Sequence, residues 1–412
     1  MSHFSPRTGP VRRSAVVACG AAVAMTVGAF GVPAGAVDVE PAGDLEVSAD
    51  GYYGSVRFDF GGGLPLLGEV AELKGDLTVG AIQNNVDSGG LEGYDEGVYT
   101  RSFGSLVAAN VAGVDLPVDL YAVEQVALPE EAEADTYGIH ELEVPLAGSL
   151  SAISGEAKAN WNDETYGHGS PGGVLTSLYS GVGQVDLVDL TELGLLDGML
   201  GNLLPVDLPI ANGPLISVGA GQLLQESGVF GKEDGTQGAY AEVSGRFADL
   251  NLLGGAANGG VTLGLAAASD TETPNAYGRL EVTGEPGGAS FDYDLPALEL
   301  WIGDEETGIA VEPGFDQTFD ILPGVSLNIN FADYRNDDTE LAEDGTYAAA
   351  SGGGLSARLT VAVPVPLLGE IEVGTAEIGL LSFPEISVEV PEGGLHADGA
   401  QDDEDDFEVG IS

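Results

Sequence analysis

Short runs of alternating apolar and polar residues, cut by glycine, are the feature that most constrains how this chain folds. The sequence has 64 glycines among 412 residues, a composition that disfavours long helices. Alternation places every second side chain on the same face, as in a half-buried strand. Such runs lie at 45–49, 55–60, 278–283, 290–295, 326–331 and 359–363. The sequence therefore predicts an all-β protein, either an antiparallel β-sandwich or an elongated two-sheet body, with one short helical insert.

One stretch, residues 181–210, departs from this alternation because its apolar residues recur every three or four positions. This spacing predicts a helix near 189–203. Asp189 and Glu192 resemble a capping box, and Pro205 ends the helix because proline disfavours helical geometry in the preceding residue. A leucine stripe follows one face: Leu193, Leu196, Leu200 and Leu203. We expect this helix to plug one end of the β-body, with an exposed helix that binds a lipid or a partner as the alternative.

The first 36 residues have the organisation of a secretory signal peptide. Basic residues at 7, 12 and 13 precede an apolar stretch over 15–32, and a small-x-small triplet follows at 34–36, so cleavage is expected after Ala36. Sec export is favoured over twin-arginine export, because the residues after Arg13 match the twin-arginine pattern poorly. The single cysteine, Cys19, lies inside this apolar stretch. Lipidation of Cys19 is the alternative, and the apolar stretch continues past it.

The rest of the chain is predicted to form two β-rich lobes and a tail. The first lobe spans 37–212 and carries the helical insert, and the second spans 213–392. A single continuous sandwich is the alternative. Consecutive acidic residues within 393–412 repel one another and predict a disordered acidic tail. No transmembrane segment is expected, because no other stretch approaches about 18 consecutive apolar residues.

Acidic residues dominate the composition. The chain has 67 Asp and Glu residues against 12 Lys and Arg residues, a formal net charge of −55. Three of the basic residues lie in the predicted signal peptide, so removing it leaves nine and brings the net charge near −58. Such a surface repels nucleic acid, which is therefore excluded as a partner. Two interpretations of the charge stay open: a protein stabilised by salt or by bound calcium, and one that is simply very soluble.

Internal similarities indicate a reused structural unit. The sequence Glu-Asp-Gly-Thr at 233–236, with Tyr-Ala at 240–241 and Ser-Gly at 244–245, recurs at 343–346, 347–348 and 351–352. This DGT…YAxxSG arrangement resembles actinobacterial secreted surface proteins of the choice-of-anchor type. The resemblance implies an outer domain carried at the cell surface, and it carries over no catalytic residues. No sorting motif or hydrophobic tail follows in this chain, so the resemblance does not predict a mode of attachment.

Calcium is the metal that the sequence favours, because calcium takes carboxylate and carbonyl oxygens in flexible numbers. Acidic loops that could supply these ligands contain the candidate residues Asp163, Glu164, Asp337, Asp338 and Glu340. None of these loops has the spacing of an EF-hand. Transition metals are not expected, because histidines and cysteines at liganding spacing are missing from the sequence. No other cofactor is predicted.

Catalytic motifs are missing from the sequence as well. His168 lies in a glycine-rich loop without a nucleophile elbow, and His140 lies in a strand pattern that should turn it to solvent. Carboxylate pairs are too frequent to identify a glycosidase. Trp301 is expected in the core, whereas Trp161, beside Asn160, Asn162 and Asp163, is the candidate for an exposed position that could serve a sugar site.

The sequence thus predicts a secreted protein, extracellular or associated with the cell surface, that is adhesive or structural and not an enzyme. Its expected partners are a cell-wall glycan or another surface protein. A secreted glycosidase-like hydrolase that uses paired carboxylates is the alternative. A deep cleft with two carboxylates near Trp161 would favour the hydrolase, and smooth faces with shallow pockets would favour the surface protein.

Overall fold

The computed structural model describes residues 45–60, 73–111, 114–116, 122–127, 134–144, 148–161, 172–187, 214–265, 276–303, 308–332, 339–352, 354–365 and 369–395. Within these ranges the regular structure consists of strands and one short 3-10 turn, η4 (Ala256–Asn258). None of the described residues belongs to a helix long and apolar enough to cross a membrane. The predicted signal peptide, the helix near 189–203 and residues 396–412 of the predicted tail lie outside the described residues. The first three residues of that tail, 393–395, are ordered, with Leu395 buried and hydrogen-bonded to Gln237.

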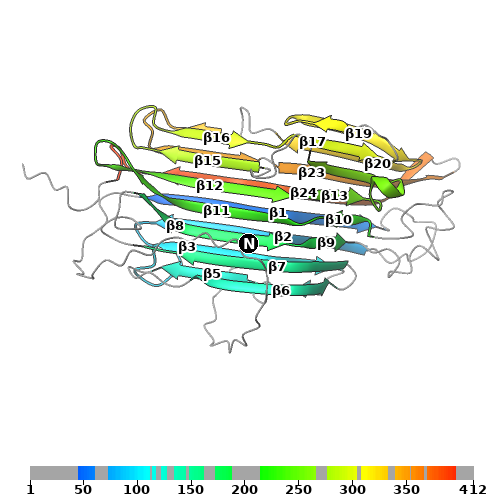
Figure 1. Cartoon of the computed structure of the whole chain (residues 1–412), viewed down its shortest axis with the longest axis horizontal. Coiled ribbons are helices and arrows are strands. Elements are labelled where there is room, and N and C mark those ends of the chain that lie inside the picture. Colours follow the sequence, from blue (N-terminus) through cyan, green and yellow to red (C-terminus); the bar gives the residue numbers. More distant parts are fainter. Residues whose placement is uncertain are drawn as a thin grey trace, which may run out of the picture. The chain divides into compact units, whose positions relative to one another are not determined.

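The strands form two antiparallel sheets, which confirms the predicted all-β, two-sheet class (Figure 1). The first sheet has 11 strands and contains the beginning and the end of the chain. Its strands are β1 (Glu46–Phe60), β2 (Leu73–Asp87), β3 (Thr100–Val111), β4 (Val114–Leu116), β5 (Ala122–Ala127), β19 (Phe315–Leu322), β20 (Val325–Ala332), β21 (Thr339–Leu341), β22 (Tyr347–Gly352), β23 (Gly354–Val365) and β24 (Gly369–Glu389). Their main order is β19-β20-β23-β24-β1-β2-β3-β4.

The second sheet has 13 strands and is built from the middle of the chain. Its strands are β6 (Asp135–Val144), β7 (Gly148–Ala159), β8 (Gly172–Val182), β9 (Gln184–Leu187), β10 (Ile216–Val218), β11 (Gly221–Gly231), β12 (Gln237–Phe247), β13 (Asp249–Leu252), β14 (Val261–Leu265), β15 (Ala276–Val282), β16 (Ser290–Asp294), β17 (Leu298–Ile302) and β18 (Ile309–Val311). Their main order is β16-β15-β12-β11-β8-β7-β9-β10-β13-β14-β17-β18.

Alternation in the sequence accounts for these strands. β15 alternates strictly between buried and partly buried residues, and most of β7 does the same. Every second side chain can then enter the space between the sheets while its neighbours face outward. The six runs predicted from alternation fall in β1, β15, β16, β20 and β23, so each of these predictions is confirmed.

The predicted division into two lobes at residue 212 is wrong, because strands from both sides of that position pair in each sheet. In the first sheet β1 pairs with β24 along most of its length. In the second sheet β8 pairs with β11, and β9 pairs with β10. The middle of the chain thus builds one sheet, while the two flanking parts combine into the other. The alternative expectation, a continuous sandwich, describes this topology.

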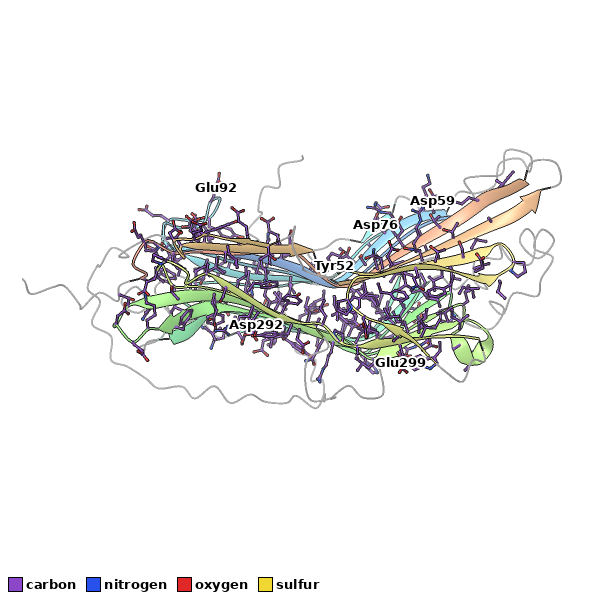
Figure 2. The ribbon with its side chains drawn as sticks, turned by 90° about the horizontal axis from the view of Figure 1, so that it is seen from above. Tyr52, Asp59, Asp76, Glu92, Asp292 and Glu299 are labelled. Atoms are coloured by element: carbon purple, nitrogen blue, oxygen red, sulfur yellow. The ribbon has the colours of Figure 1, made fainter. Side chains whose placement is uncertain are left out.

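One hydrophobic core fills the space between the sheets. It includes Leu77 and Ile82 from β2, Leu178 from β8 and Leu223 from β11, all essentially buried. Figure 2 shows the two layers edge-on with side chains between them. Acidic residues such as Asp76 and Asp292 are exposed. Burial of this apolar surface stabilises the sandwich. The described residues contain no cysteine, so no disulfide among them adds to this stabilisation.

A transverse break crosses the second sheet. β8 and β9 are successive parts of one extended segment, as are β10 and β11, and as are β12 and β13. The interruptions lie at Gly183, at 219–220 and at Ala248, and the register places them beside one another across neighbouring strands. On β7 the same line meets Ala152, whose φ of 48° is in the left-handed region. The break is therefore a feature of the sheet and not of a single strand.

Side chains of the first sheet insert into the second sheet at this break. The Tyr53 ring occupies the space that a Cβ atom at Gly221 would need, and the Tyr53 hydroxyl donates a hydrogen bond to the Gly219 carbonyl at 3.0 Å. Leu106 lies in the same way against Gly155, where a Cβ would be 2.5 Å from Leu106 Cδ2. These glycines let the two layers approach closely along one line.

Candidate functional site

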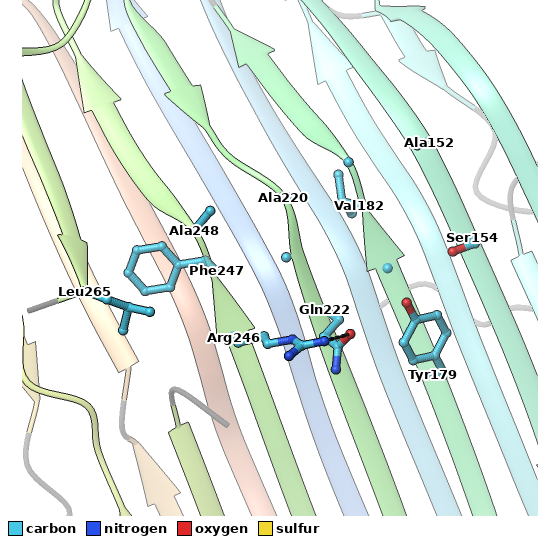
Figure 3. A pocket seen from close by; sticks show the side chains of 13 residues that line it. Ala152, Ser154, Tyr179, Val182, Ala220, Gln222, Arg246, Phe247, Ala248 and Leu265 are labelled. Carbon is cyan, nitrogen blue, oxygen red and sulfur yellow. Dashed lines mark hydrogen bonds between the residues drawn. The ribbon is translucent and has the colours of Figure 1, made fainter. Parts of the chain in front are cut away.

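The break leaves a groove of about 430 Å³ on the outer face of the second sheet (Figure 3). Alternation fixes which side chains face it. Ser180 points inward, because a Cβ at Gly80 of the first sheet would be 2.7 Å from Ser180 Oγ, so its neighbour Tyr179 faces outward. Leu223 is fully buried, so Gln222 beside it also faces outward. The volume lies within the range of small-molecule sites in proteins.

Arg246 supplies the positive charge in the groove. It is the Cα partner of Gln222 across β11 and β12, and its Nη2 donates a hydrogen bond to Gln222 Oε1 at 3.0 Å. Within the described part of the chain no carboxylate forms an ion pair with Arg246. The guanidinium is thus oriented by a neutral amide and keeps further donors for a ligand.

The remaining lining is neutral. Tyr179 lies over Gly181, where a Cβ atom would overlap its phenol oxygen, and Ser154 adds a hydroxyl beside them. Leu265 supplies apolar surface on the other side of the groove, where Phe247 is almost fully buried beneath it. The arrangement therefore offers one cation and several hydrogen-bond donors beside an apolar wall, without a nucleophile–base pair.

A charged row crosses the same outer face next to the groove. Glu226, Glu242 and Arg279 are successive Cα partners on β11, β12 and β15. Arg279 binds Glu242 at 2.8 Å and Glu281 at 2.7 Å, and its guanidinium lies 4.1 Å from the centre of the Tyr240 ring. Burial raises the pKa of Glu226, and the nearby Glu242 charge raises it further. In this row the arginine is neutralised within the protein, in contrast to Arg246.

The residues predicted to bind calcium do not form a site within the described part of the chain. Asp163, Glu164, Asp337 and Asp338 lie outside the described residues. Glu340 is exposed on the short strand β21. Across the described ranges, no group of three or more histidine, cysteine, aspartate or glutamate residues is placed to hold a metal ion. The predicted residues are therefore not brought together in the part of the chain that can be seen.

The acidic turns of the repeated unit hold hydrogen bonds of the chain itself. Thr236 donates to Asp234 Oδ1 from both its backbone N–H, at 3.0 Å, and its hydroxyl, at 2.7 Å. Thr346 makes the same two bonds to Asp344, at 3.1 and 2.7 Å. These bonds lower the pKa of Asp234 to about 2 and also lower the pKa of Asp344. The sequence similarity therefore corresponds to the same local turn in both sheets.

The ammonium group of Lys232 lies among several carboxylate and carbonyl oxygens beside the acidic turn at 233–236. Its Nζ lies 2.8 Å from Glu285 Oε1, 3.0 Å from the Thr283 carbonyl and 3.6 Å from Asp234 Oδ2. A fourth oxygen, the Gly393 carbonyl, is 3.5 Å away. The ammonium group thus takes the place that a bound cation would take among these ligands.

The structure agrees with the prediction for one histidine and differs from the predictions for both tryptophans. His140 is exposed, as predicted. The prediction for Trp161 is wrong, because it is only 2% exposed and stacks on Tyr99 with ring centres 4.8 Å apart. Trp301, expected in the core, is only half-buried. The alternation of apolar and polar residues does not reveal which tryptophan is buried against another side chain.

Sequence reasoning did not single out Arg246 as a site residue. A local signal exists, since Arg279 has Glu281 two positions along the same strand face, whereas Arg246 has Ser244 and Ala248. The absence of an acidic neighbour on that face marks Arg246 in a chain with this many carboxylates. The cross-strand partner and the break beneath it depend on sheet register, which the local sequence does not reveal.

Comparison with known proteins identifies no family for this chain. No family model matches the chain, and no curated protein matches it. Among solved structures, the crystal structure of Pseudomonas aeruginosa OccK9 (OpdG) aligns at 9% identity over 84% of this chain and 98% of that chain, with a TM-score of 0.12. A TM-score this low supports no conclusion about fold or activity.

Proposed function

We propose that this chain is a secreted, non-catalytic surface or extracellular protein with an adhesive or structural role. The observation that carries the proposal is the lining of the groove. It combines Arg246 and Gln222 with neutral donors and apolar side chains, and it contains no acidic pair. Such a surface is suited to holding a partner, and its lining contains no histidine, carboxylate, lysine or cysteine for general acid–base catalysis.

Sequence features support the extracellular setting. The first 36 residues resemble a signal peptide, and the repeated unit resembles actinobacterial choice-of-anchor surface proteins. The acidic surface disfavours nucleic acid as a partner. A cell-wall glycan or another surface protein is the partner class that fits this setting.

The hydrolase alternative receives less support. Its site was expected beside Trp161, yet that ring is packed against Tyr99 and offers no platform for a sugar. The groove that the described residues do form carries an arginine where a glycosidase would need two carboxylates.

The test is a binding assay combined with an activity assay. The full chain is incubated with purified cell-wall glycans and with extracellular matrix proteins, with and without calcium. We expect at least one preparation to retain the protein without release of new reducing ends. Retention by none of them contradicts the adhesive role, and release of reducing ends contradicts the non-catalytic one.

A further inference from the structure

The groove on the second sheet differs in charge from the rest of the protein. Acidic residues make up 67 of the 412 positions, so a lining of 13 residues chosen at random would contain about two. The lining contains no acidic residue, and it includes the basic residue Arg246. The net charge of the chain repels anions at long range, while this groove can attract an anionic group at contact distance.

The donors in the groove are directed and partly unused. Gln222 accepts a hydrogen bond from Arg246 through Oε1, so its amide N–H groups are not used in this bond. The guanidinium has donors beyond the one used by Gln222. Guanidinium groups bind carboxylates through two parallel hydrogen bonds, and such charge-assisted bonds are among the strongest in proteins.

The apolar wall limits what the anionic group is attached to. Leu265 lies across the groove from Tyr179 (Figure 3), and Phe247 beside it is only 3% exposed and belongs to the core. A fully hydrated ion gains nothing from that wall, whereas an acid on a ring or a short aliphatic body buries its apolar part there. A single arginine with a neutral amide also matches one negative charge better than the two charges of a phosphate monoester.

We propose that this groove is a binding site for a monoanionic carboxylate on a small apolar or ring-shaped body. Arg246 and Gln222 bind the carboxylate, and Leu265 and the Tyr179 ring contact the body. This inference deepens the proposed function. It rests on that function in one respect, namely that the carboxylate belongs to the partner macromolecule. Small probes test the groove separately from the partner.

The experiment uses ligand-observed fluorine NMR on the full chain. The probes are 4-fluorobenzoate, 4-fluorobenzyl alcohol and 4-fluorophenyl phosphate, which share a ring and differ in charge. We expect saturable binding of the benzoate in the millimolar range or tighter, with at least tenfold weaker binding of the other two. Equal binding of the alcohol, tighter binding of the phosphate, or no saturable binding of the benzoate overturns the proposal.

Variants locate the site. Arg246→Gln should weaken benzoate binding at least tenfold, and Ala220→Trp should weaken it by filling the groove while keeping the charge. Arg57→Gln is the matched control, because Arg57 is an exposed arginine on β1 of the other sheet. It should bind as the natural chain does. Equal loss in Arg57→Gln and Arg246→Gln overturns the proposal, and unchanged melting temperatures show that each variant is folded.

Failure of the groove and failure of the proposed function are separable. Benzoate binding that depends on Arg246, without retention by any glycan or matrix protein, supports the groove and contradicts the adhesive role. Retention that persists in Arg246→Gln, with no benzoate binding by the natural chain, supports the adhesive role and overturns this site.

Discussion

The Tyr53 ring lies against Gly221 where the two sheets approach, and no side chain fits at that glycine unless the ring moves. We expect Gly221→Ala to destabilise the fold by about 1–3 kcal/mol, the usual cost of overpacking a core. Urea unfolding measures the change. Gly138→Ala on the edge strand β6 is the control, since its nearest neighbour would be 3.8 Å away. Equal stability of the two variants would show that the Tyr53 contact does not constrain the sheets.

Glu226 gives a prediction for pH. Its pKa is raised above the ordinary value of 4.5 by burial and by Glu242, so the folded state binds the proton more tightly than the unfolded state. The stabilisation is fully present below pH 4.5 and is lost as the pH rises through the folded-state pKa. Glu226→Gln should therefore raise the melting temperature at pH 7 and leave it unchanged at pH 4.

Thermal melts of Glu226→Gln at the two pH values, with Glu92→Gln as the control in an exposed loop, check this expectation. The control should not change at either pH. A Glu226→Gln variant that melts below the natural chain at pH 7 would mean that the charged carboxylate is stabilising.

At the scale of elements, Lys232 joins the β11–β12 turn to the loop after β15 and to residues 390–395. Its side chain is 10% exposed, so the ammonium is largely enclosed by its oxygen partners. Lys232→Met should destabilise the fold by about 1–3 kcal/mol, because hydrogen bonds to a charged group are lost. Hydrogen exchange should also accelerate in 283–289 and 390–395.

Lys74→Met is the control for Lys232. Lys74 lies 3.2 Å from Asp59, but its side chain is 55% exposed, and exposed ion pairs contribute little. We expect a change below about 1 kcal/mol for this variant. If both lysine variants lose the same stability, the convergence of oxygens around Lys232 has no structural role.

The strands were predictable from sequence, and their pairing was not. β15 and β20 alternate over enough residues to be identified locally, because alternation reflects one buried face. The pairing of β1 with β24 joins the two ends of the described chain, and local sequence contains no trace of it. The break at Ala248 was equally hidden, since an alanine between two strand-like runs is an ordinary strand residue. Arg246 is functionally interesting only once that break is known.

At the scale of the whole molecule, the net charge of −55 sets the response to salt. Like charges spread over both outer faces repel one another and favour the unfolded chain. Raising the ionic strength from 0.1 M to 1 M shortens the screening length from about 10 Å to about 3 Å. We expect the melting temperature to rise steadily with NaCl over this range. A flat curve would favour the interpretation that the charge serves solubility alone.

The two sheets share one core, and each contains strands from both halves of the chain. A partner held on the outer face of the second sheet therefore acts on a sandwich that spans most of the sequence. The groove is the part of the structure on which the proposed function most depends.

Hydrogen–deuterium exchange of the full chain, alone and with purified cell-wall glycan, tests that dependence most directly. Binding at the groove predicts slower exchange in peptides from β8, β11 and β12 around 179–183, 219–222 and 246–248, and the loss of this effect in Arg246→Gln. Protection confined to the first sheet, or no protection anywhere, would contradict the account.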